Sequence, residues 1–197
     1  MQVFSVSGTQ IHAGRDLPQA LPENGFVWIA CSREWFQDEL AAIQNTLELL
    51  TGRNLVDLHV SDLLNTQLPS RFDYSSHYDL MVFRRLAQRS PDATSVGTQG
   101  KRPGPPVLNR IDTSPVGFAV FDRVLLSVHP SDCAVRETYA SRLMASTPAF
   151  AQAPETADLR SAGARGVPAS PADMMLRIIS HMVDSYLDLR RELSRQL

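Results

Sequence analysis

The fold class is decided by residues 26–50, FVWIACSREWFQDELAAIQNTLELL. The run Phe26–Ala30 is short, apolar and uninterrupted, which is typical of a strand buried on both faces. Ser32 stands where a helix N-cap is expected, and Gly52 follows as a stop signal. Between them an inward apolar stripe recurs at helical spacing through Trp35, Leu40, Ile43, Leu47 and Leu50. A buried strand that leads directly into a helix predicts the start of an α/β fold.

The chain continues with further strand and helix signals on both sides of this stretch. Weak alternation predicts an edge strand at Gln2–Val6, and the residues from Gly8 to Gly25 are rich in turn formers. The other elements that we expect are a helix over about 56–64, strands at 72–74 and 78–86, a hairpin of 116–121 with 123–129 around Asp122, and a helix capped by Ser131 that ends near Met144. Residues 90–115 lack apolar periodicity and are predicted to form a long surface loop. The pattern indicates a mixed sheet with helices packed on its faces.

The last 27 residues predict one long amphipathic helix. Ser170 fits the N-cap position, Pro171 the first helical position, and Asp173 the positive end of the helix dipole. At about 1.5 Å per residue the helix would be roughly 40 Å long. No glycine, asparagine or proline follows to stop it, so we expect it to be the beginning of a longer helix. Its apolar seam, at alternating steps of four and three, is Met175, Ile179, Met182, Tyr186, Leu189 and Leu193, which is typical of a helix packed lengthwise on another helix.

Three segments follow from these patterns. We expect an α/β domain over residues 1–147, a linker or irregular connection over 148–170, and the helical arm over 171–197. The linker prediction rests on a composition dominated by alanine, proline, serine and glycine.

Composition excludes several classes of function. The hydrophobic content of 43% is that of a globular protein with a buried core, and a formal net charge of -2 gives no strong field to recruit nucleic acid. No stretch approaches the roughly 18 to 20 apolar residues of a membrane span, and the N-terminus lacks a signal-peptide pattern. Cys31 and Cys133 match no metal-binding spacing, so we expect reduced thiols.

Catalytic signatures are absent as well. The chain has no phosphate-binding loop, no dinucleotide fingerprint, no zinc-protease motif and no nucleophile elbow, so an enzyme is not expected. His59 and Asp62 lie one helical turn apart, a spacing that could seed a metal site and is also typical of a solvated helix surface. Asp62 and Asp184 are carboxylates of the kind that Mg²⁺ prefers. From composition alone, ordinary roles as helix-surface or capping residues are favoured for both.

The order of short motifs resembles the cytoplasmic domain of the CorA family of divalent-cation transporters. The likeness begins at Val27-Trp-Ile29 and runs collinearly to the C-terminus. The segments that carry it are Leu58-His-Val-Ser-Asp62-Leu-Leu-Asn65, Pro69-Ser-Arg71-Phe72, Tyr78-Asp-Leu-Met-Val-Phe-Arg84, Gly117-Phe-Ala-Val-Phe121, Val124-Leu-Leu-Ser-Val-His129, Asp173-Met-Met-Leu176 and Met182-Val-Asp184-Ser-Tyr186. Ser61 and Ser180 stand where the family often has acidic residues.

This resemblance implies an α/β/α sandwich with a mixed central sheet and a long C-terminal stalk helix. It also implies a homopentamer anchored in the inner membrane by a transmembrane segment absent from residues 1–197, with this domain on the cytoplasmic side. The implied function is regulation of divalent-cation flux by a metal ion bound between subunits. Mg²⁺, or Co²⁺, Ni²⁺ or Zn²⁺, would bind weakly, with Asp62 and Asp184 as the matching acidic positions.

Two alternative functions are compatible with the sequence. A stand-alone cytosolic interaction module would use the terminal helix to form oligomers, which its apolar seam supports. A small hydrolase with an unrecognised site is the third hypothesis. A homopentameric transport protein with no nucleic-acid partner is the leading one.

Overall fold

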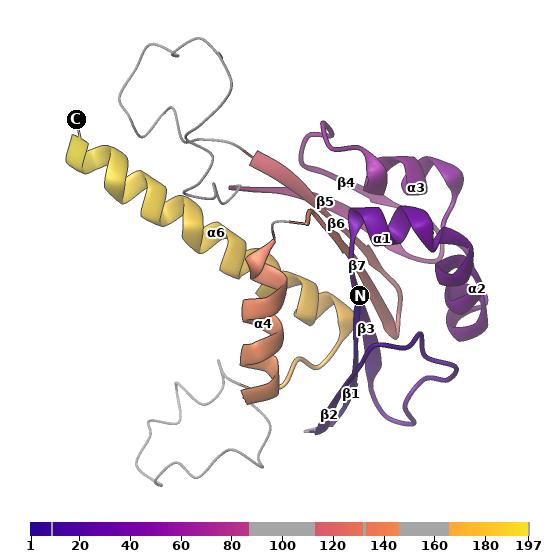
Figure 1. The fold of residues 1–197 in the computed structure, drawn as a ribbon. Helices are drawn as coiled ribbons and strands as arrows, with labels where there is room; N and C mark the ends of the chain where they lie inside the picture. Colours follow the sequence, from indigo (N-terminus) through magenta and orange to yellow (C-terminus); the bar gives the residue numbers. More distant parts are fainter. Residues whose placement is uncertain (9, 87–112, 132, 146–165, 197) are drawn as a thin grey trace, which may run out of the picture.

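A seven-stranded mixed sheet forms the centre of the molecule (Figure 1), in the strand order β2-β1-β3-β7-β6-β5-β4. The computed structural model describes residues 1–8, 10–86, 113–131, 133–145 and 166–196. The strands are β1 Gln2–Ser7, β2 Gln10–Gly14, β3 Phe26–Ser32, β4 Arg71–Tyr74, β5 Asp79–Leu86, β6 Thr113–Val120 and β7 Val124–His129. Among these strands β3 and β7 pair in parallel, and the other neighbours pair antiparallel. Helices cover both faces, so the predicted α/β/α sandwich is confirmed.

The N-terminal edge of the sheet differs from the prediction. β1 is an inner strand, because it pairs with β3 on one side and with β2 on the other. β2 lies within the segment predicted to be turns, and only Ile11 of its five residues is buried. A strand that buries a single side chain has almost no alternation for sequence analysis to detect.

The predicted first helix is present as two helices. α1 spans Arg33–Asp38 and α2 spans Leu40–Thr51, separated at Glu39, whose φ of -108° and ψ of 24° lie outside helical values. Both predicted end signals are confirmed. The Ser32 hydroxyl accepts a hydrogen bond from the Trp35 N–H, and Gly52 ends α2 with a φ of 73°.

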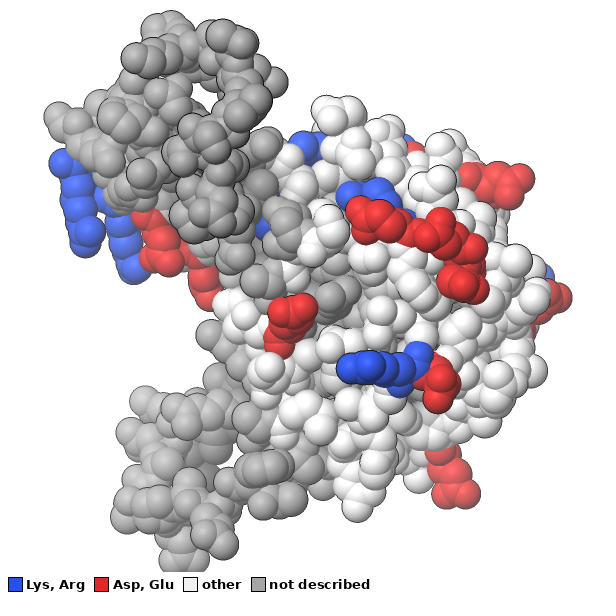
Figure 2. Space-filling model, viewed as in Figure 1, with Lys and Arg blue, Asp and Glu red and all other residues white. Residues whose placement is uncertain are grey.

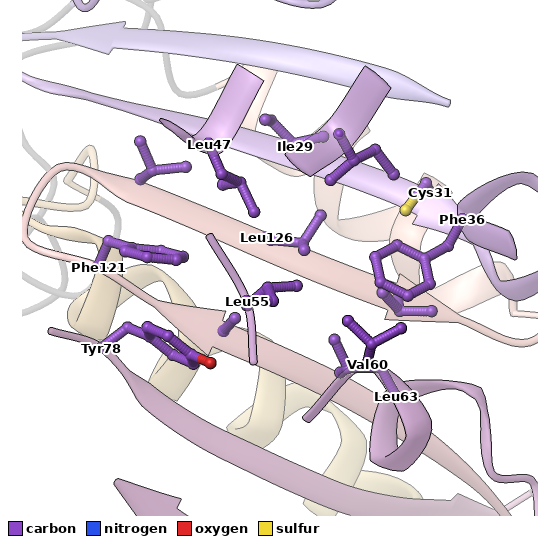
Figure 3. Packing of buried hydrophobic residues seen from close by; sticks show 14 of the residues in the cluster. Ile29, Cys31, Phe36, Leu47, Leu55, Val60, Leu63, Tyr78, Phe121 and Leu126 are labelled. Carbon is purple, nitrogen blue, oxygen red and sulfur yellow. The ribbon is translucent and has the colours of Figure 1, made fainter. Parts of the chain in front are cut away.

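One face of the sheet is covered by α1, α2 and α3, which spans Asp57–Leu64. The core beneath these helices joins side chains of the sheet to the helices' inner faces (Figure 3). Leu63 of α3 lies directly over Gly117 of β6, where a Cβ would come within 2.3 Å of Leu63 Cδ2. The absence of a side chain at Gly117 therefore lets α3 approach the sheet closely.

The opposite face is covered by α4, Ala134–Ala145, and by α6, Pro171–Gln196. α4 begins three residues after the predicted cap Ser131. The N-terminal part of α6 packs on the sheet, and its C-terminal part extends beyond the sheet (Figure 1). The Ser170 hydroxyl accepts the Asp173 N–H, so the predicted helix start is confirmed.

The apolar seam predicted for α6 is partly wrong. After Pro171 the buried residues are Met174, Met175, Ile178 and Met182. They share one core with the sheet and α4, and they do not pack along the length of a single helix. The Tyr186 hydroxyl donates to the Arg84 carbonyl at 2.6 Å, which ties the middle of α6 to β5. Ile179, Tyr186, Leu189 and Leu193 are half-buried.

Several predictions fall outside the described residues. Most of the predicted loop at 90–115 does so, although Thr113–Pro115 belong to β6. Most of the predicted linker at 148–170 does so too, and the division into 1–147, 148–170 and 171–197 stays a prediction. In the part of the chain that the structure describes, no helix is long and apolar enough to cross a membrane.

Candidate functional site at Asp62

Asp62 lies on the inner side of α3, with only 9% of its side chain exposed. A carboxylate removed from water in this way needs a cation or hydrogen-bond donors close by. Its Oδ2 atom has no hydrogen-bond partner, although it lies 3.3 Å from Nη1 of Arg71. The contact is therefore an ion pair without a well-aligned hydrogen bond, and Asp62 is neither a helix cap nor a solvated surface residue.

Arg71 bridges two carboxylates. It is the first residue of β4, and alternation along the strand places Asp73 on the same face of the sheet, toward α3. Nη2 of Arg71 donates to Asp73 Oδ2 at 2.5 Å, while Nη1 faces Asp62. One guanidinium therefore joins α3 to the edge strand of the sheet.

His59 continues this network one helical turn before Asp62. Its Nε2 lies 3.7 Å from Asp73 Oδ2, and its Nδ1 lies 2.8 Å from the hydroxyl of Tyr78. The same hydroxyl accepts the N–H of Val56 at 3.0 Å. The Tyr78 hydroxyl therefore contacts both the backbone and the imidazole, and which of Nδ1 and the hydroxyl donates depends on the tautomer of His59. The predicted solvated pair of His59 and Asp62 is thus a buried, partnered one.

The local electrostatics favour an ionised Asp73 and a neutral Tyr78. The backbone N–H of Tyr74, followed by the Arg71 guanidinium, holds the pKa of Asp73 below its usual value. Burial raises the pKa of Tyr78 above its usual value. The network therefore carries one permanent cation, Arg71, between two carboxylates.

Asp184, the second predicted ligand, is placed quite differently. It is exposed on α6, and no hydrogen bond or ion pair joins it to another described residue. α6 belongs to the core on one face of the sheet and α3 to the core on the other. Within one chain the fold does not bring Asp62 and Asp184 together.

The described residues do not surround Asp62 with a set of three potential metal ligands. Among the described residues there is no group of three or more histidine, cysteine, aspartate or glutamate side chains that could hold a metal ion. Ser61 is exposed beside Asp62, and the hydroxyl of Ser180 donates to the Leu176 carbonyl of its own helix. Metal binding by Asp62 and Asp184 stays a prediction.

Sequence reasoning missed Arg71 and Asp73. The signal in the sequence is that Arg71 and Asp73 lie two residues apart in a strand, because this spacing places both side chains on one face. Which helix would cover that face depends on the order of the sheet, and no local pattern gives that order. The pairing of Asp62 with Arg71 is therefore set by the tertiary structure and cannot be recognised from the local sequence.

A second polar cluster is buried beneath α4. The indole N–H of Trp28 donates to the Ser127 hydroxyl at 2.7 Å, and His129 Nε2 lies 2.8 Å from the same oxygen. His129 Nδ1 lies 3.4 Å from the sulfur of Cys133. These contacts satisfy polar groups inside the core, which is the ordinary requirement for burying them.

Comparison with solved structures identifies the fold. The "ZntB cytoplasmic domain from Vibrio parahaemolyticus RIMD 2210633" is similar with a TM-score of 0.57 and 14% identity. The "full-length CmaX protein" has a TM-score of 0.60 at 13% identity, and the "CorA magnesium transporter from Methanocaldococcus jannaschii" has 0.61 at 12%. No protein-family model and no curated protein matches the sequence.

These likenesses extend over almost all of the chain and over only part of the solved structures. They cover 98 to 99% of this chain, but 62% of the ZntB domain and 48% of the CmaX and CorA chains. At such low identity they show the fold alone. The chain has the fold of a CorA-like cytoplasmic domain, as its motif order predicts.

Proposed function

We propose that this chain is the cytoplasmic domain of a CorA-like divalent-cation transport protein and that it regulates ion flux. The observation that supports this most is the likeness of nearly the whole chain, the long helix α6 included, to about half of two full-length proteins, one of them a magnesium transporter by its name. The collinear motifs from Val27 to Tyr186 support it independently. Transport itself would take place in a part of the longer protein outside residues 1–197.

The exposed surface of α6 fits a role between subunits. Leu176, Val183 and Leu187 are between 39% and 57% exposed, and they follow one another at steps of seven and four along the helix. This stripe lies apart from the side of α6 that packs on the sheet, so it is available to a neighbouring helix. The protruding end of α6 carries both signs of charge (Figure 2), from Asp188, Arg190 and Arg191 among others. A homopentamer in the inner membrane, with this domain on the cytoplasmic side, is the assembly that we propose.

Regulation by a divalent cation between subunits, with Mg²⁺ as the first candidate, is the finer part of the proposal. Asp184 fits such a role, because an exposed carboxylate can bind a hydrated ion together with carboxylates of a neighbour. Asp62 does not fit it in the observed arrangement, because Arg71 already faces its buried oxygen. Any metal response of this chain is therefore assigned to Asp184 rather than to Asp62.

Ion flux in liposomes tests the proposed function. The coding sequence is extended to its own stop codon, and the purified product is placed in vesicles that contain a fluorescent divalent-cation indicator. We expect uptake of at least one of Mg²⁺, Co²⁺, Ni²⁺ and Zn²⁺ above that of protein-free vesicles. A stop codon directly after Leu197, or no flux of any of these ions, would contradict transport.

The same preparation tests the regulatory metal. With Asp184→Ala we expect flux to become less sensitive to inhibition by divalent cation on the domain side. Asp188→Ala, on the same exposed helix, is the matched control, because Asp188 is instead paired with Arg191 at 3.1 Å. Equal inhibition in all three proteins would remove Asp184 from the regulatory site.

The alternative function is a stand-alone interaction module that forms oligomers through α6. The exposed stripe of α6 supports this reading equally well. Light scattering of the intact chain and of a chain ending before Val183 tests whether α6 forms oligomers. The flux result is needed as well, because both functions predict oligomers and only the transport protein predicts flux. Oligomers without flux favour the module.

A further inference from the structure

We propose that the guanidinium of Arg71 is a built-in cation for Asp62, which makes the docking of α3 on the sheet independent of metal ions. Arg71 reaches two carboxylates from β4, Asp62 at 3.3 Å and Asp73 at 2.5 Å. It therefore stands where a cation shared by the two carboxylates would stand. The inference rests on the proposed function in one respect, because it concerns how this domain responds to the ions that the whole protein would carry.

The burial of Asp62 is the first step of the argument. A carboxylate with 9% of its side chain exposed is costly unless positive charge compensates it. Among the described residues, Arg71 is the cation that the structure pairs with it. Since Oδ2 of Asp62 has no hydrogen bond, the compensation at this oxygen comes from the charge of the guanidinium.

Mutual exclusion is the second step. A divalent ion such as Mg²⁺ would sit about 2.1 Å from its carboxylate oxygen and would keep several of its waters. The guanidinium already lies 3.3 Å from the same oxygen, in surroundings that leave little of Asp62 open to water. A dication and a guanidinium at that separation repel each other strongly. Metal binding at Oδ2 of Asp62 would therefore require Arg71 to leave.

The neighbouring side chains give the third step. If Arg71 left, Asp62 and Asp73 would face a space with no cation, and His59 would stand 3.7 Å from Asp73. As they stand these three side chains form no group that could hold a metal ion, but two carboxylates and an imidazole are donors that divalent ions accept once no guanidinium lies between the carboxylates. Removal of Arg71 should therefore create at Asp62 a metal response that the natural chain lacks there.

A second arginine strengthens the same interface without metal. Arg33 of α1 donates to the Leu63 carbonyl at 3.2 Å and to the Pro115 carbonyl at 2.7 Å. It thereby joins the C-terminal end of α3 to β6. Arginines thus hold both the inner face and the end of α3.

Thermal unfolding of the 197-residue chain with and without metal tests the inference. Asp184→Ala is present in every protein of this test, so that the exposed carboxylate of α6 cannot contribute. With Arg71 in place we then expect MgCl2 and CoCl2 to change Tm no more than NaCl of equal ionic strength does. For Arg71→Met, which keeps the length of the side chain and removes its charge, we expect a lower Tm and a saturable rise with metal. At ten times the dissociation constant the rise should be about 3 to 6 °C.

Further variants identify the site. Adding Asp62→Asn to Arg71→Met should abolish the metal response, and Arg71→Lys should stay insensitive to metal because it retains a cation. Arg177→Met is the matched control, since it removes an arginine from a half-buried pair with Asp173 and should create no metal response. If Arg71→Met does not fold in metal-free buffer, recovery of its near-ultraviolet circular dichroism on addition of MgCl2 or CoCl2 is expected.

Two results would overturn the inference. One is a saturable metal response of the natural chain that Asp62→Asn abolishes, because Arg71 would then fail to replace the ion. The other is an Arg71→Met variant that neither responds to metal nor recovers its fold with it. A failure of transport is distinguishable from both, because flux is measured on the longer protein and leaves these melting data unchanged.

Discussion

Replacing Gly117 by alanine should loosen α3 from the sheet. A Cβ at this position would lie 2.3 Å from Leu63 Cδ2, whereas ordinary contacts begin at 3.4 Å, so Leu63 must give way by about 1.1 Å. Leu63 is only 1% exposed, so its side chain has to shift within the core. Overpacking of this kind costs about 1 to 3 kcal/mol. Because Leu63 follows Asp62 directly, the displacement also disturbs the ion pair with Arg71.

Urea and thermal unfolding measure this cost. For a domain of this size we expect Tm to fall by about 2 to 12 °C, from about 2 to 4 °C for each kcal/mol. Gly14→Ala is the matched control, because a Cβ there has no atom within 4 Å and the change should stay within about 0.5 kcal/mol.

A double-mutant cycle isolates the contact. Leu63→Ala alone should cost about 2 to 5 kcal/mol, through lost burial and a cavity. In the double variant the new methyl group enters that cavity, so the total loss should be smaller than the sum by at least about 1 kcal/mol. If Gly117→Ala is as harmless as Gly14→Ala, or if the two losses add, α3 does not rest on Gly117.

Two further predictions concern other parts of the sheet. Gly25→Ala should lower the free energy of unfolding by at least about 3 kcal/mol. Gly25 has a φ of 144°, and a Cβ there would lie 1.8 Å from the Val6 carbonyl oxygen. A urea midpoint close to that of the natural chain would refute this. Burial raises the pKa of Tyr139 to about 12 from 10.0, so its neutral form is favoured in the folded state. The stability that neutral Tyr139 contributes is complete below pH 10 and is lost as the pH rises toward 12. In Tyr139→Phe the urea midpoint should therefore fall less steeply between pH 10 and pH 12. An unchanged slope would contradict this prediction.

The elements that the sequence predicts best are those with strong local signals. β3 is apolar up to Ser32 because it is buried on both faces, and the β6–β7 hairpin is largely apolar and buried on either side of Asp122. Ser32 and Gly52 act as helix ends through their own side-chain and backbone chemistry, so neighbours in space are not needed to recognise them. These parts of the fold follow from short stretches alone.

The elements that it predicts poorly depend on distant partners. β2 has one buried residue, and its pairing with β1 gives it a place in the sheet. The helix predicted from the Ser32 cap to about Leu50 is interrupted at Glu39, where neither glycine nor proline marks a break. The inward side of α6 includes Met174 and Ile178 because the helix lies on a sheet, whereas the heptad interpretation assumed another helix.

Asp62 illustrates why the site itself was only half predicted. Aspartate is mostly exposed in proteins, so composition alone favours a surface role. The close approach of α3 over Gly117 buries this carboxylate, and the register of β4 beside β5 then brings Arg71 to it. Burial changes the role of this residue. A carboxylate at the surface could bind a hydrated ion, whereas a buried carboxylate must have its charge compensated by a nearby group. The position that resembles a metal ligand in sequence is therefore, in this fold, one half of an ion pair.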